Sequence, residues 1–74
     1  MKEGIIFFNA NAKRPDIRFR NGSFYGGLHC GNTIEIFSNG EWHPARVEYR
    51  SRTGTWYLAG VEIEGKIYGE SVRC

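Results

Sequence analysis

Four side chains in this 74-residue sequence could act as a nucleophile, a base or a metal ligand: His29, Cys30, His43 and Cys74. A cysteine nucleophile needs a histidine base within a hydrogen-bonding reach of about 3 Å. His29 and Cys30 are adjacent, so in a strand their side chains would point to opposite faces. Cys30 and His43 could meet across a sheet, but no third residue that would orient the histidine is recognisable. The sequence therefore predicts that the protein is not an enzyme.

The same residues carry suitable donors for a tetrahedral zinc site, but their spacing does not favour one. The chain has no Cys-x2-Cys and no His-x3-His pair. Cys30 is better interpreted as a small buried apolar residue, and His29 or His43 as a hydrogen-bonding residue that fixes a loop. The Gly26-Gly27 pair lacks the following helix and the lysine of a phosphate-binding loop. We expect no metal site and no cofactor.

Arginine and aromatic side chains form the best candidate for a binding face. Arg18 and Arg20 lie on one side of one predicted strand, and Arg46 and Arg50 lie on one side of another. Small barrels bind nucleic acid by adding aromatic platforms to a basic groove. The candidate platforms are Phe24, Tyr25, Phe37 and Tyr57. The alternation along the strands places some of these rings on the outer face. In an alternative interpretation, the arginines pair across the sheet with Asp16, Glu35 and Glu48 and only cover a solvated face.

Protein binding is the second class of function that these residue types support. Arginine, tyrosine and tryptophan are enriched at interface hot spots, and an edge strand can accept a strand from a partner. Near the C-terminus, an acidic hairpin with Glu62, Glu64 and Glu70 is a candidate for contacting a basic groove of a partner. Two candidate contact surfaces therefore remain open, the arginine face and the acidic hairpin.

The side chains of both surfaces must be positioned by β-strands. Asn39-Gly40 is a strong hairpin signal because both residues tolerate positive φ. Before this turn Ile34 and Ile36 alternate with polar residues, and after it Val47 and Tyr49 do the same. A period of two on both arms predicts one buried face and one solvated face.

Further strands are expected on both sides of this hairpin. Their ranges are 4–8 (an apolar run compatible with burial on both faces), 16–20, 23–25 after an Asn21-Gly22 turn, 55–59, 61–64 and 66–68 around a turn at Glu64-Gly65, and 71–73 as a closing edge. No window shows the 3.6-residue apolar repeat of a helix. Five to seven short antiparallel strands predict an all-β protein, and at this length a small SH3-like barrel that forms a single domain over residues 1–74.

The composition predicts where the core comes from and where the protein resides. Eleven residues are Phe, Tyr or Trp, and each aromatic side chain can bury about 150–250 Å². We therefore expect Trp42, Trp56, Phe19 and some of the tyrosines to carry the core. The net charge of +2 does not by itself indicate nucleic-acid binding. With two cysteines, no signal peptide and no apolar span, the sequence favours a cytosolic protein with reduced thiols and no membrane contact.

Three motifs, YGGLHCG, NGEWHPARVE and WYLAG, are similar to those of a family of short bacterial proteins of uncharacterised function. That family occurs often in Gram-positive bacteria, their phages and conjugative elements, with the pattern Y-G-L-H-C-G, N-G-x-W-x-P-x-R-x-E and W-Y-L-x-G. The matching positions are Tyr25, Gly27, Leu28, His29, Cys30, Gly31, Asn39, Gly40, Trp42, Pro44, Arg46, Glu48, Trp56, Tyr57, Leu58 and Gly60. One extra glycine stands at 26 or 27. The resemblance implies a common fold and a mobile-element setting, and it implies no established activity.

Together, the residues and the resemblance predict a non-enzymatic binding module in the bacterial cytoplasm. Its expected partner is a host protein or protein–nucleic-acid complex, such as a defence complex, which it would modulate by protein binding. The alternative is direct binding of single-stranded DNA or RNA. The residues expected to carry these contacts are Arg18, Arg20, Tyr25, Arg46, Arg50, Tyr57, Glu62 and Glu64.

Overall fold

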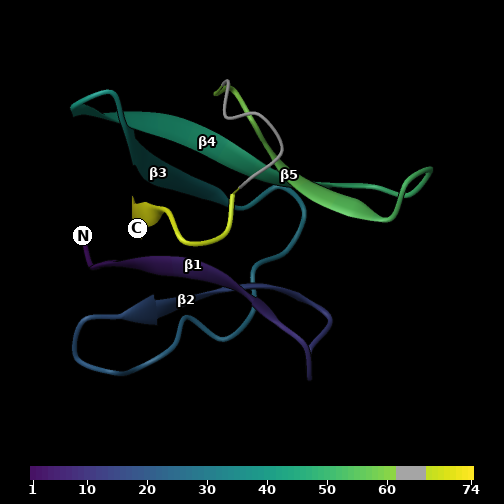
Figure 1. The fold of residues 1–74 in the computed structure, drawn as a ribbon, viewed down its shortest axis with the longest axis horizontal. Helices are drawn as coiled ribbons and strands as arrows, with labels where there is room; N and C mark the ends of the chain where they lie inside the picture. Colours follow the sequence, from purple (N-terminus) through teal and green to yellow (C-terminus); the bar gives the residue numbers. More distant parts are fainter. Residues whose placement is uncertain (62–66) are drawn as a thin grey trace.

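The computed structural model describes residues 1–61 and 67–74, which form one antiparallel sheet of six strands and no helix (Figure 1). The strands are β1 (Glu3–Asn9), β2 (Arg14–Phe19), β3 (Thr33–Ser38), β4 (Glu41–Arg50), β5 (Thr55–Ala59) and β6 (Ser71–Arg73). Their order across the sheet is β2-β1-β6-β3-β4-β5. The predicted all-β fold of short antiparallel strands is confirmed.

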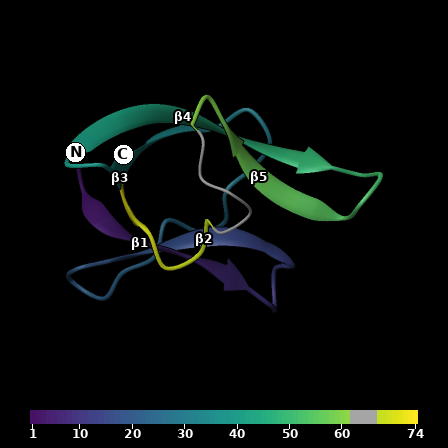
Figure 2. The ribbon, with the colours of Figure 1, turned by 45° about the horizontal axis from the view of Figure 1, so that its top comes forward.

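The sheet is bent but is not closed into a barrel. Figures 1 and 2 show β1–β2 and β3–β4–β5 as two halves that face each other. β2 and β5 are the two ends of the sheet, and in the part of the chain that the structure describes they do not pair with each other. They approach through side chains, because the guanidinium of Arg14 on β2 lies 5.7 Å from the ring centroid of Trp56 on β5. The expected SH3-like barrel is thus an open, curved sheet.

Both Asn-Gly turns form, but the strand predicted over residues 23–25 is only a single bridge between Phe24 and Arg18. Asn39 and Gly40 have φ values of 52° and 78° and connect β3 to β4, with Ser38 directly opposite Glu41. At the second turn the Phe19 N–H donates to the Ser23 carbonyl over 2.8 Å, and the chain then returns antiparallel beside β2. Local turn chemistry therefore fixes both reversals.

The position of β6 differs from the prediction. Residues 71–73 were expected at a closing edge, but β6 lies between β1 and β3. Val72 is opposite Gly4 on one side and opposite Ile36 on the other, and it is fully buried. The last strand of the chain therefore joins the two halves of the sheet.

The core is aliphatic, which corrects the expectation that tryptophans and tyrosines would carry it. Apart from Phe19, its buried residues are aliphatic: Ile6, Ile17, Leu28, Ile34, Ile36, Ala45, Val47, Leu58, Ile67 and Val72. Trp42 and Trp56 are only partly buried, and no tyrosine in the described ranges is buried. The reason for Trp42 is register, because the two-residue turn places it opposite Phe37 on the outer face, away from Ile34 and Ile36.

The apolar run of β1 is also buried on only one face. Ile6 is fully buried, whereas Ile5 on the opposite face is 44% exposed. Phe8 shares the face of Ile6 but lies near the end of the strand and is 45% exposed. The predicted hairpin around Glu64-Gly65 lies mainly outside the described residues. From its second predicted strand the structure describes Ile67, which is buried, and Tyr68, which is exposed. Phe8 and Tyr68 pack edge to face, with ring centroids 5.8 Å apart.

A glycine in β1 allows β1 and β2 to approach closely, and it gives a first prediction. A Cβ atom on Gly4 would lie 2.4 Å from the carbonyl oxygen of Arg18 and 2.9 Å from Cγ2 of Ile17. We expect Gly4→Ala to destabilise the fold by about 1–3 kcal/mol, as overpacking does in other cores. Urea unfolding measures the loss, and Glu3→Ala on the neighbouring exposed residue is the control. An unchanged midpoint for Gly4→Ala would show that the strands are not held at this spacing.

Candidate functional site

The predicted arginines lie on the outer face of the sheet or beside it, in two separate groups. Arg18 is exposed on β2 and Arg20 follows in the turn, whereas Arg46 and Arg50 are exposed on β4. Three strands, β1, β6 and β3, lie between β2 and β4. The four arginines therefore do not line one groove, and each group must be considered as a surface of its own.

Within the described residues, none of these four arginines forms the expected cross-strand ion pair with Asp16, Glu35 or Glu48. Arg46 forms an ion pair with Glu48 on the same strand. Glu35 instead pairs with Arg73 of β6, whose guanidinium lies 4.3 Å from the ring centroid of Trp42. Within residues 1–61 and 67–74, Arg18, Arg20 and Arg50 have no carboxylate partner. All three side chains are exposed at the surface.

The first group belongs to a surface that we call the β1–β2 face, formed by Ile5, Phe7, Arg18 and Phe24. These four residues line a shallow depression with a volume of about 450 Å³. Ile5 is opposite Arg18 in the register, and Phe24 bridges to Arg18 from the other side. The rings of Phe7 and Phe24 are 5.8 Å apart, and Phe24 is 57% exposed. The face thus combines exposed apolar side chains with one central cation.

Further cations border this face. Arg18 also lines a second hollow with Arg20 and Glu3, and Arg20 shares a third with Lys2. Three cations and one carboxylate therefore surround the apolar depression on this side. Ile5, Phe7 and Lys2 did not figure among the predicted site residues, although strict alternation along residues 4–8 would have placed half of that run outward.

A buried carboxylate holds the loop that carries Phe24 and Tyr25. Asp16 is only 2% exposed, and its Oδ1 accepts hydrogen bonds from the N–H groups of Ile17, Gly26 and Gly27 over 2.8, 2.9 and 3.0 Å. The Asn9 amide donates to its other oxygen over 3.4 Å. Burial alone would raise the pKa of Asp16, but these hydrogen bonds outweigh it and hold the pKa below its ordinary value.

The second group belongs to a projecting hairpin that we call the β4–β5 arm, residues 46–59. Figure 2 shows this hairpin extending away from the rest of the sheet. On its outer face the guanidinium of Arg50 lies 4.5 Å from the ring centroid of Tyr57. On its other face Tyr49 packs against Trp56, with centroids 4.9 Å apart, and Trp56 meets Arg14. Each face of the arm thus carries a ring beside a cation.

Of the remaining predicted contact residues, the structure describes Tyr25, which does not line the depression of the β1–β2 face. Tyr25 is 44% exposed in the loop after Phe24, where its N–H donates to the Ile17 carbonyl over 2.9 Å. Glu62 and Glu64 lie outside the described residues, so the acidic hairpin has no structural description. Glu70 is half-buried, and its carbonyl oxygen accepts a hydrogen bond from the Ile6 N–H over 3.1 Å.

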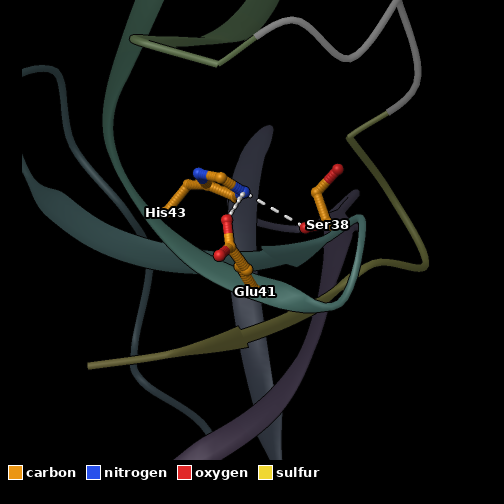
Figure 3. A network of polar contacts seen from close by, with 3 residues as sticks. All are labelled: Ser38, Glu41 and His43. Carbon is orange, nitrogen blue, oxygen red and sulfur yellow. Dashed lines mark hydrogen bonds and ion pairs between the residues drawn. The ribbon is translucent and has the colours of Figure 1, made fainter.

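The histidines and cysteines do not form an activated nucleophile in the described part of the chain. Figure 3 shows that the Nε2 of His43 reaches the backbone carbonyl of Ser38 and not its hydroxyl, with a distance of 3.1 Å. The Glu41 carboxylate lies 4.0 Å from the same nitrogen. Because a carbonyl oxygen only accepts, Nε2 carries the proton, and His43 fixes the hairpin turn as the sequence suggested.

Cys30 is exposed, which corrects the expectation that it is buried. It lies in a turn in which the His29 N–H donates to the Asn32 side chain over 2.7 Å, and the preceding Leu28 takes the place in the core. Among residues 1–61 and 67–74, no three His, Cys, Asp or Glu side chains gather as metal ligands would. The same ranges contain no helix long and apolar enough to cross a membrane.

Comparison with known proteins places this fold and sequence in a family of unknown function. The family described as domain of unknown function DUF5348 matches residues 4–73, and the chain belongs to it. A crystal structure of a protein from Ruminococcus gnavus is similar to this chain with a TM-score of 0.87 and 38% sequence identity. That similarity covers 99% of this chain and 100% of the other. No curated protein matches the chain significantly.

The hydrogen bonds of Asp16 give a second prediction, on the pH dependence of stability. Because its folded-state pKa is lowered, the ionised carboxylate stabilises the fold above its unfolded-state pKa of about 4. That stabilisation is lost as the pH falls from there through the lower folded-state pKa. At pH 7 we expect Asp16→Asn to cost about 1–3 kcal/mol of unfolding free energy.

Urea unfolding between pH 7 and pH 2 tests this role. The Asp16→Asn variant should lose less stability than the parent over the acid range, since it has no carboxylate to protonate there. Glu41→Gln, at a carboxylate whose side chain is 76% exposed, should leave the acid dependence unchanged. Parallel curves for the parent and Asp16→Asn would exclude the role of this carboxylate.

Proposed function

We propose that the protein is a non-enzymatic binding module that contacts a partner protein through the β1–β2 face. In its concrete form, it is a modulator of a host protein–nucleic-acid complex, encoded by a phage or mobile element and acting in the bacterial cytoplasm. The motif resemblance supports the mobile-element setting. The observation that carries the binding role is the apolar cluster around Arg18, formed by the exposed side chains of Ile5 and Phe24 and the half-buried Phe7.

The composition of this face favours a protein partner. Contiguous exposed apolar side chains on a small soluble domain are typical of protein interaction sites. Phe24 and Ile5 can be desolvated by an apolar side chain that enters the depression, while Arg18 forms a forked contact with a carboxylate. Such a combination of aromatic and arginine residues at the centre of a patch is characteristic of hot spots.

The surrounding charges indicate the kind of partner. Lys2, Arg18 and Arg20 outnumber Glu3 around the depression. Charge complementarity therefore favours a partner segment that is acidic and carries one bulky apolar side chain. A basic nucleic-acid channel of a host complex would not suit this face, but an acidic assembly surface would.

Substitution of the face gives a third prediction. Arg18→Glu and Phe24→Ser should each weaken partner binding by about 2 kcal/mol or more, a roughly 30-fold loss of affinity. Both side chains are exposed, so thermal unfolding of the variants should match the parent. Lys13→Glu makes the same change of charge in the turn before β2, outside the depression, and should bind normally.

The measurement is capture from a lysate of the encoding cell, followed by calorimetry with the purified captured protein. The proposal is supported if the Arg18→Glu and Phe24→Ser variants no longer capture the partner. The Lys13→Glu variant should still capture it, and nuclease treatment should not change the result. Capture that persists in both face variants contradicts it. Capture that disappears after nuclease treatment would show that nucleic acid, and not protein, is the ligand.

A further inference from the structure

We infer that the β4–β5 arm binds the phosphodiester backbone of a nucleic acid. This surface lies at the other end of the sheet from the β1–β2 face and does not depend on the proposed protein contact. Its support comes from the shape of the arm, from arginines that have no acidic partner among the described residues, and from the lack of an exposed aliphatic side chain on residues 46–59.

The outer half of the arm is a ribbon of only two strands. β3 begins at Thr33 opposite Arg46, and the last backbone bonds from that side join Gly31 and Asn32 to Val47. Beyond Val47, β4 pairs with β5 alone as far as Arg50 opposite Thr55, within the part of the chain described. A two-stranded ribbon of this kind has the width that the major groove of B-DNA admits. Its outer face can also contact a single strand, whereas Trp56 on the inner face packs against the core.

The charge on the arm is predominantly positive. Residues 46–59 contain three arginines, at positions 46, 50 and 52, and one carboxylate, Glu48. Arg46 neutralises that carboxylate, which leaves Arg50 and Arg52 without an acidic partner among the described residues. Arg14 adds a cation from β2 beside Trp56. The planar guanidinium matches phosphate oxygens through two parallel hydrogen bonds.

The aromatic residues complete a surface suited to nucleotides. Arg50 lies over Tyr57 on one face of the ribbon, and Tyr49 and Trp56 lie on the other. Tyr49 is 43% exposed, so its ring is open to a sugar or a base. Rings beside cations are the arrangement that tracks a nucleic-acid strand, with phosphates on the guanidinium groups and bases on the rings.

The arm differs from the β1–β2 face in a way that separates the two ligand classes. The aliphatic residues Val47 and Leu58 on the arm are buried, and Tyr49 is its one exposed large apolar residue. A protein partner would find no aliphatic side chain to desolvate there. The cations and rings that the arm does expose are the groups that contact phosphates and bases.

Fluorescence anisotropy tests the inference with the intact chain and a labelled oligonucleotide of about 20 nucleotides. One experiment uses the single-stranded oligonucleotide, and a second uses the duplex. We expect binding at about 50 mM salt, with an affinity that falls as salt rises. Three phosphate contacts would give a slope of log affinity against log salt of about −2 on the single strand and about −3 on the duplex. Tighter binding of either form supports the inference and identifies the form.

Matched variants locate the site. Arg50→Gln combined with Arg52→Gln should weaken binding at least tenfold at low salt and reduce the slope by about 1–2, because two phosphate contacts are removed. Arg18→Gln combined with Arg20→Gln removes the same charge from the β1–β2 side and should leave the affinity within about twofold. Arg50→Lys, which keeps the charge, should retain the slope. Circular dichroism and thermal unfolding verify that the variants are folded.

Three results would overturn the inference. The first is no binding of either oligonucleotide at about 50 mM salt. The second is equal weakening by the two double variants, which would mean that net charge alone attracts the probe. The third is that poly-glutamate displaces the probe as effectively as unlabelled oligonucleotide does. None of these outcomes bears on capture of a protein through Arg18 and Phe24, so the two proposals fail independently.

Discussion

The structure depends on the pairing of β6 with two strands that are far from it in the sequence. β6 has three residues, yet it hydrogen-bonds to β1 and β3 and makes one sheet from two hairpin systems. Next to the β1–β6 pair, Lys2 and Cys74 exchange two backbone hydrogen bonds. The Lys2 N–H donates to the Cys74 carbonyl over 2.8 Å, and the Cys74 N–H donates to the Lys2 carbonyl over 3.0 Å. Val72, fully buried, brings the core residues of both halves together. Without this strand, each half would be left with one apolar face exposed to water.

The bend around β6 decides which side chains are left for binding. The inner space is filled by branched aliphatic residues, so most aromatic side chains lie outward or at the margins. On β1 and β2 the outward residues form an apolar depression around Arg18, and on β4 and β5 they form an arm with cations and rings. These surfaces lie at opposite ends of the strand order, so the proposed modulator would use them to contact two different parts of one protein–nucleic-acid complex. In the proposed modulator role, each of the two surfaces would make its own contact with the complex.

Much of the fold follows from local signals in the sequence. Asn39-Gly40 and the alternation around it fix the β3–β4 hairpin and its buried face, and the same register would have placed Trp42 outward beside Phe37. The central position of β6 has no local signal, because pairing between distant strands depends on the whole sheet. For the same reason the hydrogen bonds from Asp16 to Gly26 and Gly27 could not be predicted. The sequence predicts Arg18, Arg50 and Tyr57 as contact residues, and in the structure the two arginines are exposed and Tyr57 is half-buried. Their separation into two surfaces requires the strand order.

Amide hydrogen exchange of β6 tests the role of this strand most directly. If β6 joins the two halves, the backbone amides of Ser71–Arg73 should exchange only through global unfolding, with a protection free energy equal to that from urea unfolding. They should then match the amides in the centres of β1 and β3. Exchange of the β6 amides as fast as in the Ser51–Gly54 loop would contradict this, because the last strand would then be a frayed end and the two halves would hold together without it.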